Sequence, residues 1–237
     1  MPQEEMLEVS NKQKQLKIGI PSEDHRVESR VPITPEAVEI LTGYGHEVML
    51  ETGAGKAANY MDRDYSEKGG IILENRQEIF NRCDILLKIS PPTLEQIRWM
   101  KERQTLLSSF QVYTHRDEKY IQNLMQKKVT AIAFESIQDE NRCFPAVRSM
   151  SAIAGTTSIL IAAEYLSNMH GGKGVMLGGI TGITPTEVVI LGAGTAAEYA
   201  VRAAMGVGSE VKVFDQSIHR LRRLQGAVGQ MIPTSIF

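Results

Sequence analysis

The sequence predicts an α/β protein made of parallel β-sheets with helices packed on both faces. Short apolar segments of strand type alternate with segments of helical periodicity along most of the 237 residues, which is typical of βαβ units. Near the end of the chain, residues 188–197 read VVILGAGTAA, an apolar strand followed by a GxGxxA turn. We therefore expect an N-terminal domain with a Rossmann-like parallel sheet, followed by a second, incomplete Rossmann domain.

Turn and cap residues delimit the elements of the first domain. Thr34 and Pro35 are the N-cap and first residue of a predicted helix that ends near Leu41, before a Gly-Tyr-Gly segment. The N-terminal domain is assigned to residues 1–148. In it, strands are expected at 16–21, 46–51, 71–73, 84–89, 105–110 and 129–134, and further helices at 62–68, 75–82, 93–101 and 117–127.

A long helical pattern rich in Ala, Ile and Leu covers residues 151–168 and is expected to link the two domains, beginning at Ser149 or Ser151. A glycine-rich loop at 171–184 follows it. The second domain, residues 149–237, continues with strand, helix, strand, helix and a short third strand. A complete doubly wound sheet has about six strands, so we expect a fragment or a truncated relative of longer proteins.

The residues of the GxGxxA turn have the properties of a dinucleotide-binding site. Gly192 permits the tight turn, Gly194 lets the backbone approach a diphosphate, and Ala197 allows close packing of helix on strand. The helix N-terminus offers N–H donors to phosphate. Asp215 ends the next strand, where a carboxylate hydrogen-bonds the ribose hydroxyls and favours NAD over NADP. The alternative is an ordinary βαβ turn whose glycines serve packing only.

Composition argues against several classes of function. A net charge of −2 gives no electrostatic case for binding nucleic acid or an anionic membrane. The polar, acidic N-terminus lacks the features of a signal peptide, and no apolar run looks long enough to cross a bilayer, so a soluble cytoplasmic protein is expected. Cys83 and Cys143 lack the spacing of metal ligands and are expected to be buried free thiols.

Several segments together resemble one known family. Ahead of the nucleotide-binding turn they read KIGIP and ESRVPITP within 17–35, GYGHEV and ETGAG within 43–55, LLKISP at 86–91 and MSAIAG at 150–155. Over nearly all of residues 15–237 the chain resembles the alanine dehydrogenase and pyridine nucleotide transhydrogenase alpha-subunit family. The segments at 171–179 and 215–224 look closer to the alanine dehydrogenase branch.

The resemblance implies NAD-dependent oxidative deamination of L-alanine to pyruvate and ammonia, and its reverse, on a small amino-acid or 2-oxo-acid substrate, by a homo-oligomer. Arg30 matches the arginine that holds the substrate carboxylate, a suitable role for a guanidinium fork. Lys88 matches the lysine at the substrate carbonyl oxygen, where an ammonium stabilises negative charge. The structural alternatives are a surface ion pair for Arg30 and a strand-end lysine that reaches solvent for Lys88. Ser151 and Arg220 match positions beside the cofactor, and their alternatives are a helix N-cap and a helix-surface charge.

The sequence departs from the dehydrogenase branch at one acid–base position. That branch has a histidine after the strand at 106–110, where straight alignment places Gln111, and a glutamine cannot transfer a proton near neutral pH. His115, four residues on, is either a substitute or a solvent-exposed loop residue. The transhydrogenase branch also lacks this histidine, and the family's catalytic aspartate lies beyond the end of the chain.

Three functions therefore stay open. The first is an NAD-dependent dehydrogenase of the alanine dehydrogenase type, with Arg30, Lys88 and the Asp215 nucleotide site, and it leaves open whether this chain alone is active. The second is the NAD(H)-binding alpha-subunit domain of a proton-translocating transhydrogenase, with which Gln111 is compatible. The third is a dinucleotide-binding module without catalysis.

Overall fold

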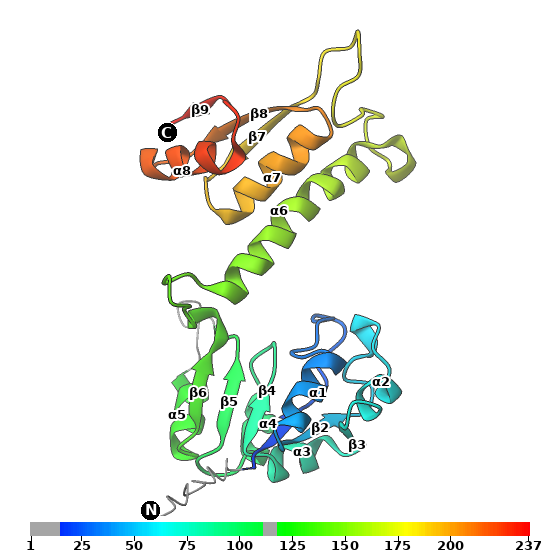
Figure 1. The fold of residues 1–237 in the computed structure, drawn as a ribbon, viewed down its shortest axis with the longest axis vertical. Helices are drawn as coiled ribbons and strands as arrows, with labels where there is room; N and C mark the ends of the chain where they lie inside the picture. Colours follow the sequence, from blue (N-terminus) through cyan, green and yellow to red (C-terminus); the bar gives the residue numbers. More distant parts are fainter. Residues whose placement is uncertain (1–14, 111–117) are drawn as a thin grey trace, which may run out of the picture. The chain divides into compact units, whose positions relative to one another are not determined.

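The computed structural model describes residues 15–110 and 118–237. The chain divides into two compact units, unit 1 (Met1–Ser136) and unit 2 (Ile137–Phe237). The predicted α/β class with parallel sheets is confirmed in both units (Figure 1). The domain boundary between residues 148 and 149 stays a prediction, and the two compact units meet between Ser136 and Ile137.

A six-stranded sheet forms the centre of unit 1. Its order is β3-β2-β1-β4-β5-β6, and every neighbouring pair in it is parallel. Because the strand order reverses between β1 and β4, these two strands form the switch point beside which open α/β sheets bind ligands. The strands are β1 (Lys17–Ile20), β2 (Glu47–Glu51), β3 (Ile71–Leu73), β4 (Ile85–Leu87), β5 (Thr105–Ser108) and β6 (Thr130–Ala133).

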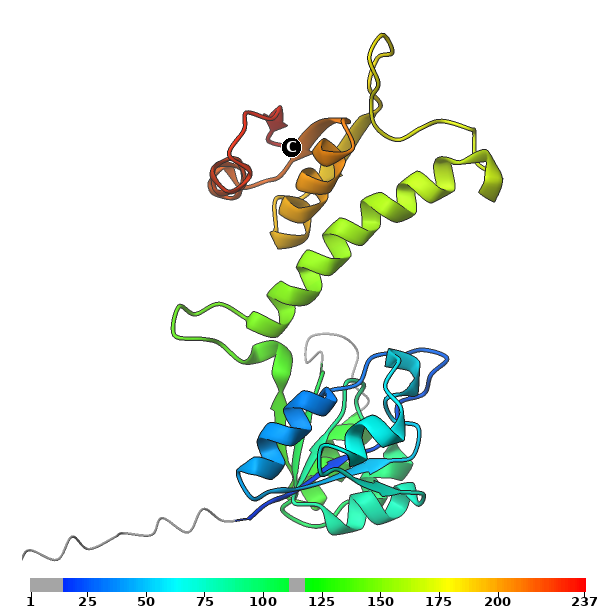
Figure 2. The same ribbon diagram turned by 45° about the vertical axis from the view of Figure 1, so that its right-hand side comes forward.

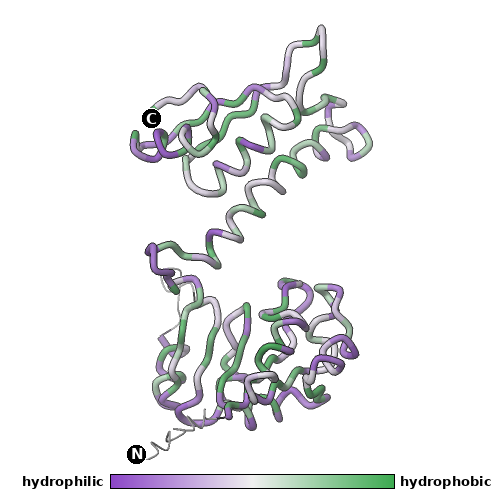
Figure 3. Tube along the Cα trace, viewed as in Figure 1, coloured by the Kyte–Doolittle hydropathy of each residue, from purple (hydrophilic) through white to green (hydrophobic). Residues whose placement is uncertain are grey.

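Helices cover both faces of this sheet, as successive residues of β2 show by packing into two different hydrophobic cores. Val48 and Leu50 pack in a cluster that contains Val38 of α1 and Tyr65 of α2. Met49, between them, packs with residues of α3, α4 and α5. The strands accordingly carry much of the hydrophobic colour of unit 1 in Figure 3. The helical segments are α1 (Pro35–Gly43), η1 (Lys56–Ala58), α2 (Asp62–Ser66), α3 (Arg76–Arg82), α4 (Leu94–Trp99), α5 (Glu118–Gln126) and η2 (Phe134–Ser136).

Unit 2 contains a three-stranded parallel sheet of order β7-β8-β9. Its core joins Ile159 of α6 to small and β-branched residues of α7 and β8, and to leucines of α8. The short third strand that the sequence predicts has two residues. The elements are α6 (Pro145–Leu166), η3 (Asn168–His170), β7 (Glu187–Leu191), α7 (Thr195–Gly206), β8 (Glu210–Phe214), α8 (Ile218–Val228) and β9 (Thr234–Ser235).

Helix α6 begins earlier than the sequence suggested. Pro145 occupies its first turn, where the missing N–H of proline costs nothing, and Phe144 is the N-cap residue without a side-chain cap. Ser151 therefore lies inside the helix, so the alternative interpretation of Ser151 as an N-cap is wrong. Ser149 is also internal, and its hydroxyl donates to the carbonyl of Pro145 at 3.0 Å.

Helix α6 runs beside α7 in both ribbon views (Figures 1 and 2). Gly155 lies at the contact, where an added Cβ would stand 2.1 Å from the Ala196 carbonyl oxygen. The helix has 22 residues and a mean hydropathy of 1.3 over its most apolar window, enough in length and composition to cross a membrane. The expectation that no apolar run is that long is wrong by this criterion. A single such helix is weak evidence for a membrane span, because core helices of soluble proteins can pass the same test.

Candidate functional site

Lys88 lies in a buried ion pair at the carboxyl end of β4. Its Nζ stands 2.9 Å from Oε2 of Glu23, and the two side chains are 3% and 2% exposed. The other carboxylate oxygen of Glu23 accepts the backbone N–H of Ile89 at 2.7 Å. The alternative of a strand-end lysine that reaches solvent is therefore wrong. Glu23 is not among the site residues that the sequence predicts, because its only sequence signal is its position shortly after a strand that ends at Pro21.

The strand order explains how Glu23 reaches Lys88. Glu23 follows β1, Lys88 follows β4, and the carboxyl ends of neighbouring parallel strands meet at one edge of the sheet. A second carboxylate lies at the same edge, because Glu51 ends β2. Glu51 accepts the Ser22 N–H at 2.8 Å and the Arg76 Nε–H at 2.8 Å. The carboxyl edge of the sheet thus combines one buried ammonium with two anchored carboxylates.

Arg30 lies on the connection between β1 and α1 and pairs with a local carboxylate. Its Nε and NH2 donate to the two oxygens of Glu28 at 2.8 and 2.6 Å, a bidentate arrangement. These hydrogen bonds raise the pKa of Arg30 and lower the pKa of Glu28. The negative charge of Glu23 also raises the pKa of Arg30, so the structure brings both residues into one electrostatic field. Arg30 is half-exposed, and its role toward a substrate stays a prediction.

The acid–base position that departs from the family lies outside the described residues, because Gln111 and His115 both fall in the segment 111–117. The strand before them is described. Its last residue, Ser108, is fully buried and its hydroxyl donates to the Ile89 carbonyl at 3.3 Å. The segment with Gln111 and His115 therefore starts three residues after Ser108 in the chain.

The GxGxxA turn has the backbone geometry that its residues suggest. Gly192 has a φ of 101°, which favours glycine, and its N–H donates to the Phe214 carbonyl at 2.6 Å. Gly194 is the N-cap of α7, and apart from its two chain neighbours no described residue has an atom within 4 Å of a Cβ added to it. Ala197 is buried. The space over Gly194 is therefore open, whereas Ala197 serves packing.

Asp215 anchors the turn from the end of β8. Its two oxygens accept the Ala193 N–H and the Ser217 N–H, both at 2.7 Å, and the residue is buried. These backbone hydrogen bonds, from Ser217 and Ala193 in that order, hold the pKa of the carboxyl below its usual range. The positive charge of Arg220 acts in the same direction. Asp215 and Arg220 are thus brought together, as both are expected to be beside an adenosine ribose.

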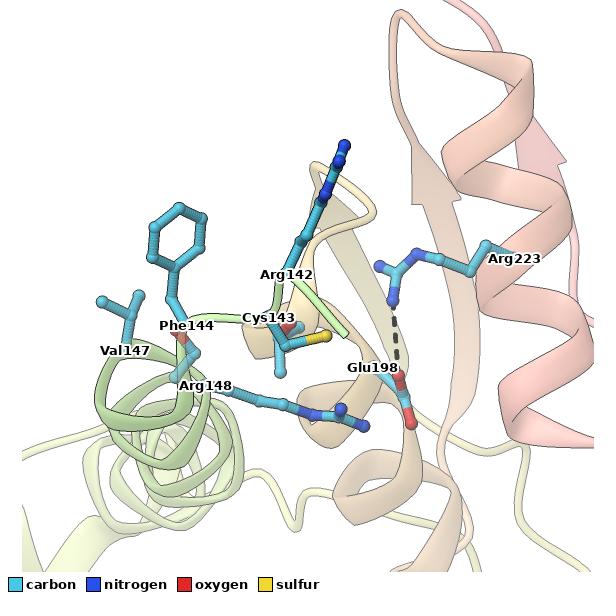
Figure 4. Close-up of a pocket in the computed structure, with 9 residues that line it drawn as sticks. Arg142, Cys143, Phe144, Val147, Arg148, Glu198 and Arg223 are labelled. Atoms are coloured by element: carbon cyan, nitrogen blue, oxygen red, sulfur yellow. Dashed lines mark ion pairs between the residues drawn. The ribbon is translucent and has the colours of Figure 1, made fainter. Parts of the chain in front are cut away.

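A pocket of about 340 Å³ within unit 2 joins the start of α6 to the start of α7. Ser151 and Thr195 line it, and Figure 4 shows Arg148 from α6 and Arg223 from α8 extending toward Glu198 on α7. Arg223 also donates to the Ala193 carbonyl at 2.9 Å, which ties the pocket wall to the glycine turn. The remaining lining residues are Arg142, Cys143, Phe144 and Val147.

The free thiols differ from expectation in one respect. Cys83 is buried, as expected, whereas Cys143 is partly exposed at this pocket.

The arginines of this pocket are also not predicted by the sequence, although Arg148 lies three residues before Ser151 on the same helix. Within the described parts of the chain, no three His, Cys, Asp or Glu side chains are grouped so that they could hold a metal ion.

Comparison with known proteins defines the class. The family description "Alanine dehydrogenase/PNT, N-terminal domain" matches residues 19–154, and "Alanine dehydrogenase/PNT, C-terminal domain" matches residues 158–235. The chain belongs to the alanine dehydrogenase/PNT family, which confirms the resemblance described above.

Individual relatives lie mainly in one branch. The chain is 37% identical to the alanine dehydrogenase of Mycolicibacterium smegmatis and 37% identical to that of Methanococcus maripaludis, each over 219 residues. Each alignment covers 92% of this chain but 58% of the relative, so the chain spans little more than half the length of these proteins.

Solved structures are also similar to this chain. An L-alanine dehydrogenase matches with a TM-score of 0.84 and 33% identity, covering 94% of this chain and 61% of that one. A transhydrogenase from Sinorhizobium meliloti matches with a TM-score of 0.77 and 21% identity, covering 93% and 61% respectively. The second match shows the shared fold only.

Proposed function

We propose that this chain supplies the substrate residues and part of the nucleotide site of an NAD-dependent amino-acid dehydrogenase. The proposed reaction is of the alanine dehydrogenase type: L-alanine, NAD⁺ and water give pyruvate, ammonium, NADH and a proton. The observation that carries this proposal is the buried Lys88 at the switch point of the sheet, in a chain 37% identical to alanine dehydrogenases. A buried, oriented ammonium at this edge of a parallel sheet suits polarisation of a substrate carbonyl.

The glycine turn supports the cofactor assignment. If Gly194 served packing only, an added Cβ would meet neighbouring atoms, as it does at Gly155, yet the described chain leaves that space empty. Open space at a helix N-cap suits a diphosphate, which would accept hydrogen bonds from the first N–H groups of α7. Asp215 and Arg220 would bind the adenosine ribose, and Ser151 would approach from α6. NAD⁺, when bound, accepts the hydride.

The remaining roles concern the substrate. Arg30 would hold the substrate carboxylate by exchanging Glu28 for it, since the guanidinium fork offers the same two donors to either carboxylate. Lys88 would donate to the carbonyl oxygen of the 2-oxo acid and stabilise the charge that develops on it. Gln111 or His115 would complete the substrate side. We further propose a soluble, cytoplasmic homo-oligomer that binds no nucleic acid.

The test is NADH formation by the full-length gene product supplied with L-alanine and NAD⁺. We expect NADH and pyruvate in equal amounts, with little activity when NADP⁺ replaces NAD⁺. A product that binds NADH but forms none from L-alanine or related small amino acids would contradict the dehydrogenase proposal and favour the dinucleotide-binding module.

A second candidate is the NAD(H)-binding part of a transhydrogenase, and Gln111 in place of the dehydrogenase histidine favours it. Hydride exchange between NADH and an NADP analogue, measured with partner subunits from the same host, distinguishes the two. Exchange without alanine turnover would establish the second candidate. Alanine turnover without exchange would exclude it.

A further inference from the structure

We propose that Glu23 is a positioning residue that fixes the Lys88 ammonium for the substrate carbonyl. This inference rests on the proposed function for the role of Lys88, although the positioning itself can be tested without turnover. Glu23 follows β1, Lys88 follows β4, and 65 residues separate them in the chain. Their contact exists only because the two strands are neighbours in the sheet.

The carboxylate of Glu23 is held at both oxygens. Oε2 accepts from Lys88 Nζ at 2.9 Å, and Oε1 accepts from the Ile89 N–H at 2.7 Å. One oxygen is thus fixed to the backbone next to Lys88, so the other oxygen stands at a set place relative to the lysine stem. A carboxylate anchored in this way restricts Nζ to one small region.

The ammonium retains capacity for a ligand. Lys88 Nζ has three N–H donors, and Glu23 is its one hydrogen-bond partner among residues 15–110 and 118–237. Buried polar groups that serve structure alone are ordinarily satisfied. A buried ammonium of this kind suits a substrate oxygen. Its ion pair with Glu23 offsets the cost of burying the charge, and its remaining N–H donors can bind the substrate.

Glu51 provides a matched control. It is also a mostly buried carboxylate at the carboxyl edge of the sheet, it also accepts a backbone N–H, and it also pairs with a cation, Arg76. It makes no contact with Lys88 within the described chain. Loss of either carboxylate perturbs the sheet edge, but only loss of Glu23 frees Lys88.

The first measurement is structural and compares crystal structures of the full-length protein with E23Q and E51Q. Glutamine keeps the size of glutamate and an oxygen for the Ile89 N–H, but not the charge. We expect Nζ to move by more than about 1 Å in E23Q, a displacement large enough to affect catalysis, and to stay in place in E51Q. An unmoved Nζ in E23Q would overturn the proposal, whether or not the protein oxidises alanine. If E23Q fails to fold, E23D serves, since the shorter carboxylate cannot reach both Nζ and the Ile89 N–H.

The second measurement is a double-mutant cycle on kcat with Lys88→Met. We expect E23Q alone to lower kcat at least about tenfold with little change in the Kd of NADH, and to add nothing once Lys88 is replaced. A merely structural Glu23 would lower kcat by the same factor in both backgrounds, which is the behaviour we expect of E51Q, and that result would refute positioning. No turnover by the wild type would contradict the proposed function and leave the displacement of Nζ to decide the positioning.

Discussion

Replacing Gly155 with alanine tests the close approach of α6 to α7. The added Cβ would stand 2.1 Å from the Ala196 carbonyl oxygen and 3.0 Å from Cβ of Tyr199. Because the first neighbour is backbone, no side-chain rotation relieves the overlap and the two helices have to separate. Gly226 of α8 is the matched control, since it is an exposed helical glycine whose added Cβ meets no described atom within 4 Å beyond its own stretch of helix.

The expected magnitudes follow from two effects. Both substitutions gain about 1 kcal/mol of helix propensity. The overlap at Gly155 costs about 3 kcal/mol, the upper part of the range for overpacking, because a backbone oxygen has to move by about 1 Å. We therefore expect G155A to destabilise unit 2 by about 2 kcal/mol and G226A to stabilise it by about 1 kcal/mol.

Native-state hydrogen exchange measured on peptides from α6 and α7 reports these differences for unit 2 alone. Ala196 lies in the first turn of α7, directly after the glycine turn, so G155A is also expected to weaken NADH binding while G226A leaves it unchanged. Equal protection of α6 and α7 in the two variants would refute the reasoning, because it would mean that the helices do not meet at Gly155.

Three further outcomes are expected. Asp215→Asn should weaken NADH binding by about 10- to 100-fold, as loss of a charged hydrogen-bond acceptor does. It should also reduce the preference of the protein for NADH over NADPH. An unchanged Kd of NADH would show that Asp215 does not belong to the cofactor site. Burial raises the pKa of Tyr65 to about 12, so the unfolded chain ionises first and the folded protein loses stability as the pH rises from 10 to 12. Tyr65→Phe should lose less stability over that range. Equal dependence of stability on pH in the wild type and Tyr65→Phe would contradict a buried phenol. Burial likewise raises the pKa of the Cys83 thiol to about 12. Of these two cysteines, only Cys143 should therefore react quickly with a disulfide reagent at pH 8 in the folded protein. Fast reaction of Cys83 as well would contradict its burial.

The elements that were predicted well are those with local signals. Thr34 and Pro35 marked the start of α1, and the Thr34 hydroxyl accepts the Ala37 N–H as the cap interpretation requires. The GxGxxA pattern placed β7, the turn and α7 correctly. The start of α6 was misplaced because Pro145 begins it without a side-chain cap, and the serines that resembled caps lie inside the helix.

The contacts that sequence reasoning missed depend on strand order rather than on local pattern. Nothing near Glu23 in the sequence points to Lys88, because the two meet only when β1 and β4 become neighbours. The Arg223 contact with the glycine turn likewise spans 30 residues and needs α8 to fold back on α7. Arg30 and Glu28 show the opposite case, since residues two positions apart pair without any tertiary structure.

The most direct test of the proposed active site is the initial rate of NAD⁺ reduction by L-alanine, compared between the full-length wild type and Lys88→Met. We expect turnover by the wild type and a fall in kcat of at least about 100-fold in the variant, the usual cost of losing a group that stabilises a developing oxyanion. The Kd of NADH, measured on the same preparations, should stay within about twofold, because the nucleotide turn belongs to the other unit. Undiminished kcat in Lys88→Met, or a wild type that binds NADH and reduces no NAD⁺ with L-alanine, would contradict the assignment.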